Sequence, residues 1–108
     1  MAPLSATTRH TIEVFGSASP RARRTLQRVE RVVRENRLHV RLENVETLPR
    51  MLELGIHATP AIAIDGDVVV TGRVPAVEEV RALLSSISRE ARQLLAYVSL
   101  IGALAGAA

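Results

Sequence analysis

The sequence predicts an α/β fold in which a mixed four-stranded β-sheet is flanked by helices. Short β-branched stretches and helical patterns alternate in the first half of the chain, which favours a right-handed crossover between parallel strands. Two further apolar stretches flank Asp65-Gly66, a strong signal for a tight antiparallel hairpin. The 108 residues suffice for one domain with one modest core. We therefore expect the element order β-α-β-α-β-β-α.

The first strand and the first helix follow each other closely. Residues 11–15 (TIEVF) are rich in β-branched side chains and end at Gly16, which predicts a strand. Ser19 and Pro20 predict a helix start, because a serine N-cap accepts a backbone N–H bond and proline at the first helical position loses no needed donor. The helix is expected to end near Asn36. Its apolar positions at helical spacing are Ala22, Leu26, Val29 and Val33.

The remaining elements complete the sheet and its helices. Alternating apolar residues within 39–45 predict a second strand with one wetter face. Gly55 is expected to end a short helix, since glycine is favoured just past a helix C-terminus. The expected elements in order are a strand at 40–45, a helix at 48–54, strands at 61–64 and 68–71, and a helix at 76–84.

The composition excludes several classes of chemistry. The chain has no cysteine, so disulfides, iron–sulfur clusters and thiolate metal sites are excluded. Aromatic residues make up 2% of the sequence, which leaves no large stacking surface for nucleic-acid bases. His10, His39 and His57 are too scattered to suggest a metal site. We therefore expect neither a metal nor a cofactor.

Arginine supplies all 14 basic residues, and the formal net charge is +3. Many of these arginines gather in one stretch, which forms a candidate basic face for nucleic acid or another polyanion. A solvated helix surface, partly balanced by Glu30 and Glu35, explains the same pattern and is the favoured interpretation. The stretch contains Arg21, Arg23, Arg24, Arg28, Arg31, Arg34, Arg37 and Arg41.

The two ends of the chain lie outside the predicted domain at 11–84. Residues 1–10 are expected to form a flexible leader, and they lack the apolar segment of a secretory signal, which favours a cytoplasmic location. Residues 85–108 are expected to form an apolar helical extension. From residue 94 onward this extension carries no charge, yet it falls short of the roughly 20 residues that a membrane-spanning helix needs. Its helical stripe consists of Ile87, Ala91, Leu94, Val98 and Ile101.

The role of this extension is open between two hypotheses. Its stripe packs against its own domain, or it mediates self-association through residues 87–104, as in a homodimer. In both cases Leu94, Val98 and Ile101 are expected to face protein. Membrane-surface binding ranks third, because only Arg89 and Arg92 supply a basic polar face.

Five motifs, in order and at the expected spacing, give residues 11–84 a resemblance to a known family. They are a strand ending in Gly16, Ser-Pro-Arg-Ala at 19–22, Gly-Ile-His-Ala-Thr-Pro-Ala at 55–61, an Ile-Asp-Gly-Asp hairpin, and Gly-Arg-Val-Pro at 72–75. The stretch resembles the short, glutaredoxin-like thioredoxins of archaea and bacteria, a type also called small redox-active disulfide proteins. The resemblance implies a thioredoxin-like fold.

The resemblance also implies a chemistry that this chain has lost. In that family a Cys-Pro-X-Cys motif opens the first helix, whose N-terminus lowers the pKa of the first thiol. Ser19 and Ala22 stand at the two cysteine positions here. A hydroxyl has too high a pKa to be ionised there and has no accessible disulfide state, so thiol–disulfide exchange is excluded. Pro60 matches the family's proline opposite the motif, which implies a cis bond after Thr59 and exposed backbone that pairs with an extended peptide.

These observations favour a redox-inactive, thioredoxin-like binding or interaction protein without catalytic residues. The expected partner is a protein or peptide at a cleft between Ser19 and Pro60, while nucleic acid and membrane are not favoured. One alternative is a thiol–disulfide oxidoreductase whose cysteines at 19 and 22 have been replaced. Another is an anion or nucleic-acid binder that uses the arginine-rich first helix. The expected binding residues are Ser19, Pro20, Arg21, Thr59 and Pro60.

Overall fold

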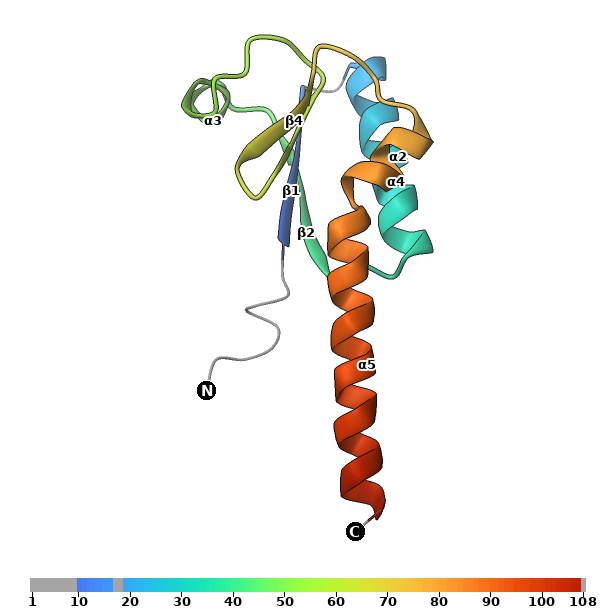
Figure 1. Cartoon of the computed structure of the whole chain (residues 1–108). Helices are drawn as coiled ribbons and strands as arrows, with labels where there is room; N and C mark the ends of the chain where they lie inside the picture. The colour runs from blue at the N-terminus through green and yellow to red at the C-terminus, as the bar shows by residue number, and fades with distance from the viewer. Residues whose placement is uncertain (1–9, 17–18, 108) are drawn as a thin grey trace.

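The computed structural model describes residues 10–16 and 19–107 and shows a four-stranded sheet, helices on both of its faces, and a long C-terminal helix (Figure 1). It confirms the predicted element order and the helical extension, with boundaries that differ by a single residue. The elements are β1 (His10–Phe15), α2 (Pro20–Glu35), β2 (Val40–Val45), α3 (Leu48–Glu53), β3 (Ala61–Ile64), β4 (Asp67–Thr71), α4 (Val77–Leu83) and α5 (Ser85–Ala107).

The sheet has the strand order β2-β1-β3-β4, so β1 and β3 are its inner strands. β1 pairs with β2 in parallel, whereas the β1–β3 and β3–β4 pairs are antiparallel, which is the mixed sheet that the sequence predicts. Asp65 and Gly66 form the hairpin turn with φ angles of 51° and 85°, and glycine adopts such values without a steric penalty. The bond between Thr59 and Pro60 is cis, as expected.

The larger part of the core lies between the sheet and the helices α2 and α4. Ile12 and Val14 of β1 point into it, together with Ile62 of β3. On α2 the buried set differs from the predicted one, because Leu26 and Val33 are only partly buried. The buried α2 residues are Ala22, Thr25, Val29 and Val32. Thr25 is tolerated there because its hydroxyl donates to the Arg21 carbonyl at 2.9 Å, which satisfies the buried donor within the helix.

The opposite face of the sheet carries α3 and a smaller core. Phe15 alternates with Val14 along β1 and therefore points to this second face, where it packs with Ile56, Ala61 and Ala63. Figure 1 shows α3 on the other side of the sheet from α2 and α4. The remainder of this face carries polar and charged side chains.

The N-terminal strand begins one residue earlier than expected. His10, placed in the leader by sequence, is the first residue of β1 and pairs in register with Val40 of β2. The rest of the expected leader, 1–9, lies outside the described residues. The strand extends because the His10 side chain has partners in two other elements, which no local pattern reveals.

The C-terminal helix α5 begins in the core and then leaves the domain (Figure 1). Ile87 is 5% exposed and Leu94 is half-buried, whereas Val98 and Ile101 are 46% and 48% exposed. The radius of gyration is 16.4 Å, above the roughly 13 Å expected of a compact domain of this size. Packing against the same chain thus accounts for the start of the predicted stripe and not for its end. In the described part of the chain, no helix combines the length and the apolar character needed to cross a membrane.

His10 ties α5 to the sheet. Its Nδ1 lies 2.5 Å from Asp65 Oδ2 in the hairpin turn, and its Nε2 lies 2.5 Å from Glu90 Oε2 on α5. A neutral imidazole has one N–H and donates to only one carboxylate, whereas the imidazolium donates to both. The hydrogen bond to Asp65 is the main reason that the pKa of His10 is raised, and Glu90 adds to it against partial burial. Desolvation would raise the pKa of Asp65, but hydrogen bonds from His10 and the Thr11 N–H hold it below the usual value.

This bridge makes the stability of the protein depend on pH. Because the folded-state pKa of His10 is raised, the bridge stabilises the fold fully below the unfolded value of 6.5 and loses its effect as pH rises through the folded-state pKa. Both carboxylates are largely exposed, so we expect His10→Gln to lower the free energy of unfolding by about 1 kcal/mol or less at mildly acidic pH. The deficit relative to the unmodified chain should vanish once the pH exceeds the raised folded-state pKa of His10, as measured by urea unfolding over a pH series.

His39→Gln is the matched control, because His39 is exposed and has no ion pair among the described residues. Its effect should be small and should not follow the pH profile of His10→Gln. A deficit of His10→Gln that stays constant from acidic to alkaline pH would contradict the charged bridge.

Candidate functional site

The first candidate site is the start of α2, where the sequence places the two lost cysteine positions. Ser19 is the N-cap residue, and its Oγ accepts a hydrogen bond from the Ala22 N–H at 3.2 Å. Pro20 occupies the first helical turn, as its lack of an N–H donor allows. Ser19 is exposed while Ala22 is buried. The structure therefore retains a helix N-terminus with an accessible first position and a buried second position.

A close approach at Gly16 brings the Pro60 loop beside this helix start. Gly16 has a φ of 122° and follows the last residue of β1. A Cβ at this position would lie 3.1 Å from the Ala22 Cβ and 3.2 Å from the Thr59 Cβ. The Pro60 Cα would lie 3.6 Å away, which is an ordinary van der Waals contact. Only a residue without a side chain fits here, so Gly16 sets the spacing between α2 and the Pro60 loop.

A short chain of hydrogen bonds links Arg21 to the same loop. Arg21 Nη2 donates to the Gly72 carbonyl at 3.1 Å, and the Gly72 N–H donates to the Pro60 carbonyl at 2.8 Å. Arg21 therefore braces the segment after β4 and is not a free cation beside Ser19. The sequence predicts Arg21 as a binding residue but gives no sign of this contact, which joins residues far apart in the chain.

These contacts bring four of the five predicted binding residues to one small surface. Ser19, Pro20, Arg21 and Thr59 are exposed, and Pro60 is buried beneath them. Among the described residues, the backbone N–H and C=O of Thr59 make no hydrogen bond. We call these four exposed residues, together with the buried Pro60 beneath them, the Ser19/Pro60 surface. It offers exposed backbone at Thr59 and a hydroxyl at Ser19, but no ionisable nucleophile.

The predicted basic face on α2 is partly used inside the chain. Arg28 Nη1 donates to the Pro75 carbonyl at 2.6 Å, and Arg31 pairs with Glu35 at 2.9 Å. Arg41 lies 3.9 Å from Glu43 on β2, so it belongs to another surface. Arg21 and Arg28 thus act as braces between α2 and the segment 72–75. This favours the solvated, structural interpretation of the arginine stretch.

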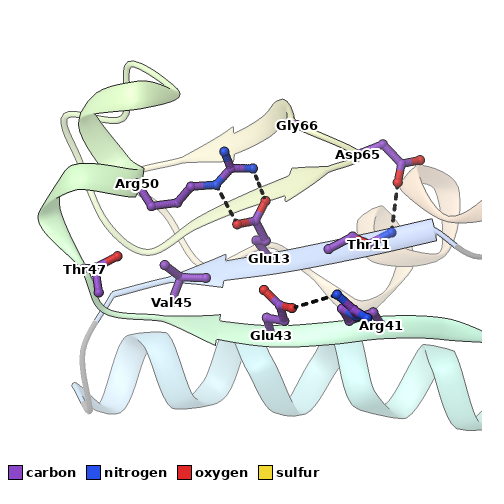
Figure 2. Close-up of a pocket in the computed structure, with 9 residues that line it drawn as sticks. All are labelled: Thr11, Glu13, Arg41, Glu43, Val45, Thr47, Arg50, Asp65 and Gly66. Atoms are coloured by element: carbon purple, nitrogen blue, oxygen red, sulfur yellow. Dashed lines mark hydrogen bonds and ion pairs between the residues drawn. The ribbon is translucent and has the colours of Figure 1, made fainter.

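A second candidate site, which the sequence analysis misses, is a groove of about 660 Å³ on the face of the sheet that α3 leaves open (Figure 2). Its floor holds Glu13, a charged residue that is 5% exposed in the central strand. Arg50 reaches Glu13 with two hydrogen bonds, from Nε at 2.9 Å and from Nη2 at 2.8 Å, and its Nη1 donates to Glu53 at 2.9 Å. The Glu13 carboxylate raises the pKa of Arg50.

Most charged side chains in this groove are already paired with one another. All the guanidinium nitrogens of Arg50 have carboxylate partners, which leaves the loose Arg41–Glu43 pair as the more open one (Figure 2). Within 10–16 and 19–107, no group of three or more His, Asp or Glu is placed to hold a metal ion. One signal was available in the sequence: a glutamate opposite the apolar face of an inner strand needs a cationic partner. Which arginine supplies it depends on the tertiary structure.

Comparisons with known proteins agree with the fold described above. Residues 10–85 match a family model described as a thioredoxin domain. The chain is similar to a thioredoxin of Methanothermobacter thermautotrophicus, with 27% identity over 74 residues that cover 68% of this chain and 96% of the relative. It is also similar to a thioredoxin of Methanocaldococcus jannaschii, with 29% identity over 75 residues that cover 69% of this chain and 86% of the relative. The resemblance based on motifs is confirmed, and nearly all of α5 lies outside the matched residues.

The helix start still has the geometry that activates a thiol, which leads to a direct test. We expect Ser19→Cys combined with Ala22→Cys to give a reversible dithiol whose first thiol has a pKa below the free value of about 8.5. The physical reason is that the Ala22 N–H and the α2 dipole, which now face the Ser19 hydroxyl, would stabilise a thiolate. Thiol titration against pH and an insulin-reduction assay measure this, with the unmodified chain inactive.

The single variant Ser99→Cys is the control, since it places an exposed thiol in the middle of α5, away from any helix N-terminus. Its pKa should stay near the free value. If the double variant titrates like this control and never closes a disulfide, the start of α2 at 19–22 lacks the geometry that activates a thiol.

The Glu13–Arg50 pair generates a second test. Arg50→Met leaves the Glu13 carboxylate buried without its cation, so we expect a clear loss in the free energy of unfolding, larger than that caused by removing an exposed arginine. Adding Glu13→Gln should recover most of this loss, because the uncompensated charge is then gone. Urea unfolding of both variants measures the difference. The control is Arg23→Met, an exposed arginine without a side-chain partner among the described residues, and strictly additive losses would argue against coupling.

Proposed function

Because the chain belongs to the thioredoxin domain family and contains no cysteine, we propose that it is a redox-inactive binding domain that holds an extended protein segment at the Ser19/Pro60 surface. One observation carries the proposal: the frame around the lost thiols is intact while the thiols are absent. Ser19 still caps α2, and Gly16 still holds the Pro60 loop against Ala22. Ser19 and Ala22 therefore keep the surface around the helix start but cannot support the redox reaction.

The contacts of the Pro60 loop support binding through the backbone. Thr59 is exposed, and its N–H and C=O make no hydrogen bond among the described residues. A backbone N–H and C=O presented together match the pairing groups of an extended peptide, as in strand addition. The loop is fixed on its far side by the Gly72–Pro60 hydrogen bond at 2.8 Å, so binding requires little ordering of the loop.

The exposed side chains beside Thr59 give this surface its selectivity. Ser19 offers a hydroxyl oxygen whose one observed bond is accepted from Ala22, so the hydroxyl proton remains available to a ligand. Pro20 supplies an exposed apolar ring next to it. We therefore expect a partner segment that pairs its backbone with Thr59 and sets small or apolar side chains against Pro20.

The anion-binding alternative has weaker support. Arg21 and Arg28 donate to backbone carbonyls of the segment 72–75, and Arg31 pairs with Glu35. These guanidinium groups would have to leave their partners before they could bind phosphate. A steep fall of affinity for nucleic acid with salt concentration would nevertheless identify such binding.

The binding proposal is tested with a library of random linear peptides selected on the immobilised chain. Enriched peptides should shift the amide resonances of Thr59, Ala61 and Arg21 in the labelled chain, and those of the groove around Glu13 should not move. Thr59→Pro removes the N–H that pairs with the peptide, so we expect affinity measured by fluorescence polarisation to fall about tenfold or more.

Ala76→Pro is the matched control for this variant. Ala76 is exposed, precedes α4 and has a φ of −69°, which proline adopts without strain. This variant should bind like the unmodified chain. Peptides that bind equally well to Thr59→Pro, or that shift only resonances of another surface, would overturn the proposal.

A further inference from the structure

The part of α5 beyond the domain presents an apolar surface that its own chain does not cover. Leu95, Tyr97, Val98, Leu100 and Ile101 are between 46% and 67% exposed, and together they make up most of the large exposed hydrophobic residues among the described ones. Residues 93–107 carry no charged side chain. A helical segment of this length is marginally stable in water by itself, so its helical state calls for a partner surface.

The spacing of the apolar residues along α5 indicates that the partner surface is another helix. Ile87, Ala91, Leu94, Val98 and Ile101 follow one another at intervals of four and three residues in alternation. This is the 3.5-residue repeat of a left-handed coiled coil, in which the seam positions pack into holes on a facing helix. The same stripe starts in the core at Ile87 and ends in solvent at Ile101, so the seam continues where the domain stops.

We propose that α5 pairs antiparallel with α5 of a second copy of this chain. Aligning Leu94 with Val98 of the other copy also aligns Ala91 with Ile101, because each pair of positions has the same sum in an antiparallel register. Small side chains then face large ones, as close packing requires. A two-fold axis relates the two helices, so every contact occurs twice.

Neighbouring positions fit the same register. Leu95 and Tyr97 flank the seam on its two sides, and near the two-fold axis each lies beside its own equivalent on the other copy. The uncharged halves overlap, so the pairing buries no charge at its centre. The helix dipoles run in opposite directions, which is the favourable arrangement for neighbouring helices.

An apolar pocket of about 210 Å³ lies where the end of the partner helix would arrive. Ile87, Ala91, Leu94 and Leu95 supply its apolar wall at the base of α5, and Arg37, His39 and Glu90 border it. Because residues 94–107 extend roughly 20 Å along the helix axis, the C-terminal turn of one copy reaches this pocket on the other. The seam and the pocket thus form one continuous surface for a second copy.

The arrangement leaves the Ser19/Pro60 surface open. In Figure 1 α2 begins at the end of the domain opposite to the direction in which α5 leaves it. A dimer joined through α5 therefore carries its two domains at opposite ends, with both of these surfaces facing outward. The inference does not depend on the proposed function of that surface.

Light scattering of the full chain tests the association. We expect a dimer, and Val98→Glu should convert it to a monomer because it places a charge in the apolar seam. The matched control is Ser99→Glu, since Ser99 is exposed on the side of α5 away from the seam and should leave the dimer intact. Circular dichroism verifies that both variants keep the folded domain.

Cysteine cross-linking tests the direction, because the chain has no cysteine of its own. When Leu94→Cys and Val98→Cys are made separately and mixed, the antiparallel register predicts a disulfide between the two variants and little within either alone. Cross-links confined to each variant alone would indicate parallel helices and overturn the register. A full chain that is monomeric and unaffected by Val98→Glu would overturn the pairing. Sedimentation of that monomer with phosphatidylcholine vesicles would then assign the apolar surface to a membrane, and the pairing would be overturned in either case.

Discussion

The burial of β1 on both faces is the constraint on which the rest of the structure depends. β1 pairs with β2 and β3, and every residue from Ile12 to Gly16 is buried. One face takes Ile12 and Val14 against α2 and α4, and the other takes Phe15 beneath α3. Glu13 on that second face is tolerable only because Arg50 neutralises it with two hydrogen bonds. The position of α3, which carries Arg50, is thereby tied to the central strand.

The same strand fixes the Ser19/Pro60 surface. Gly16 directly follows β1, and its lack of a side chain lets α2 and the Pro60 loop approach each other. The redox reaction of this fold needs two thiols, whereas the frame needs an N-cap, a glycine and a braced loop. With Ser19 and Ala22 at the two cysteine positions, the chain keeps this frame but lacks both thiols. Two positions therefore suffice to remove the redox activity while the fold remains.

Helix α5, nearly all of which lies outside the matched residues 10–85, presents an exposed apolar surface. Its base is joined to the domain by Ile87 in the core and by the His10–Glu90 ion pair. The outer half of α5 neither packs into the core nor carries a charged side chain that could form an ion pair with the domain. The packing of Ile87 and the His10–Glu90 ion pair together hold the base of α5 against the domain, and the apolar stripe leaves the domain from there. The base and the outer half of one helix thus differ in their surroundings: the base is packed and ion-paired, and the outer half is exposed and apolar.

The sequence by itself determined the element order, the Ser19 cap, the Asp65-Gly66 turn and the loss of thiol chemistry. Each of these depends on residue type and on short-range periodicity, which are local properties. Only the tertiary structure decided that Arg50 neutralises Glu13, that Arg21 braces Gly72 and that His10 joins β1 to α5. These contacts join residues far apart in the chain, and a sequence that offers many arginines as partners cannot indicate which one the fold brings close.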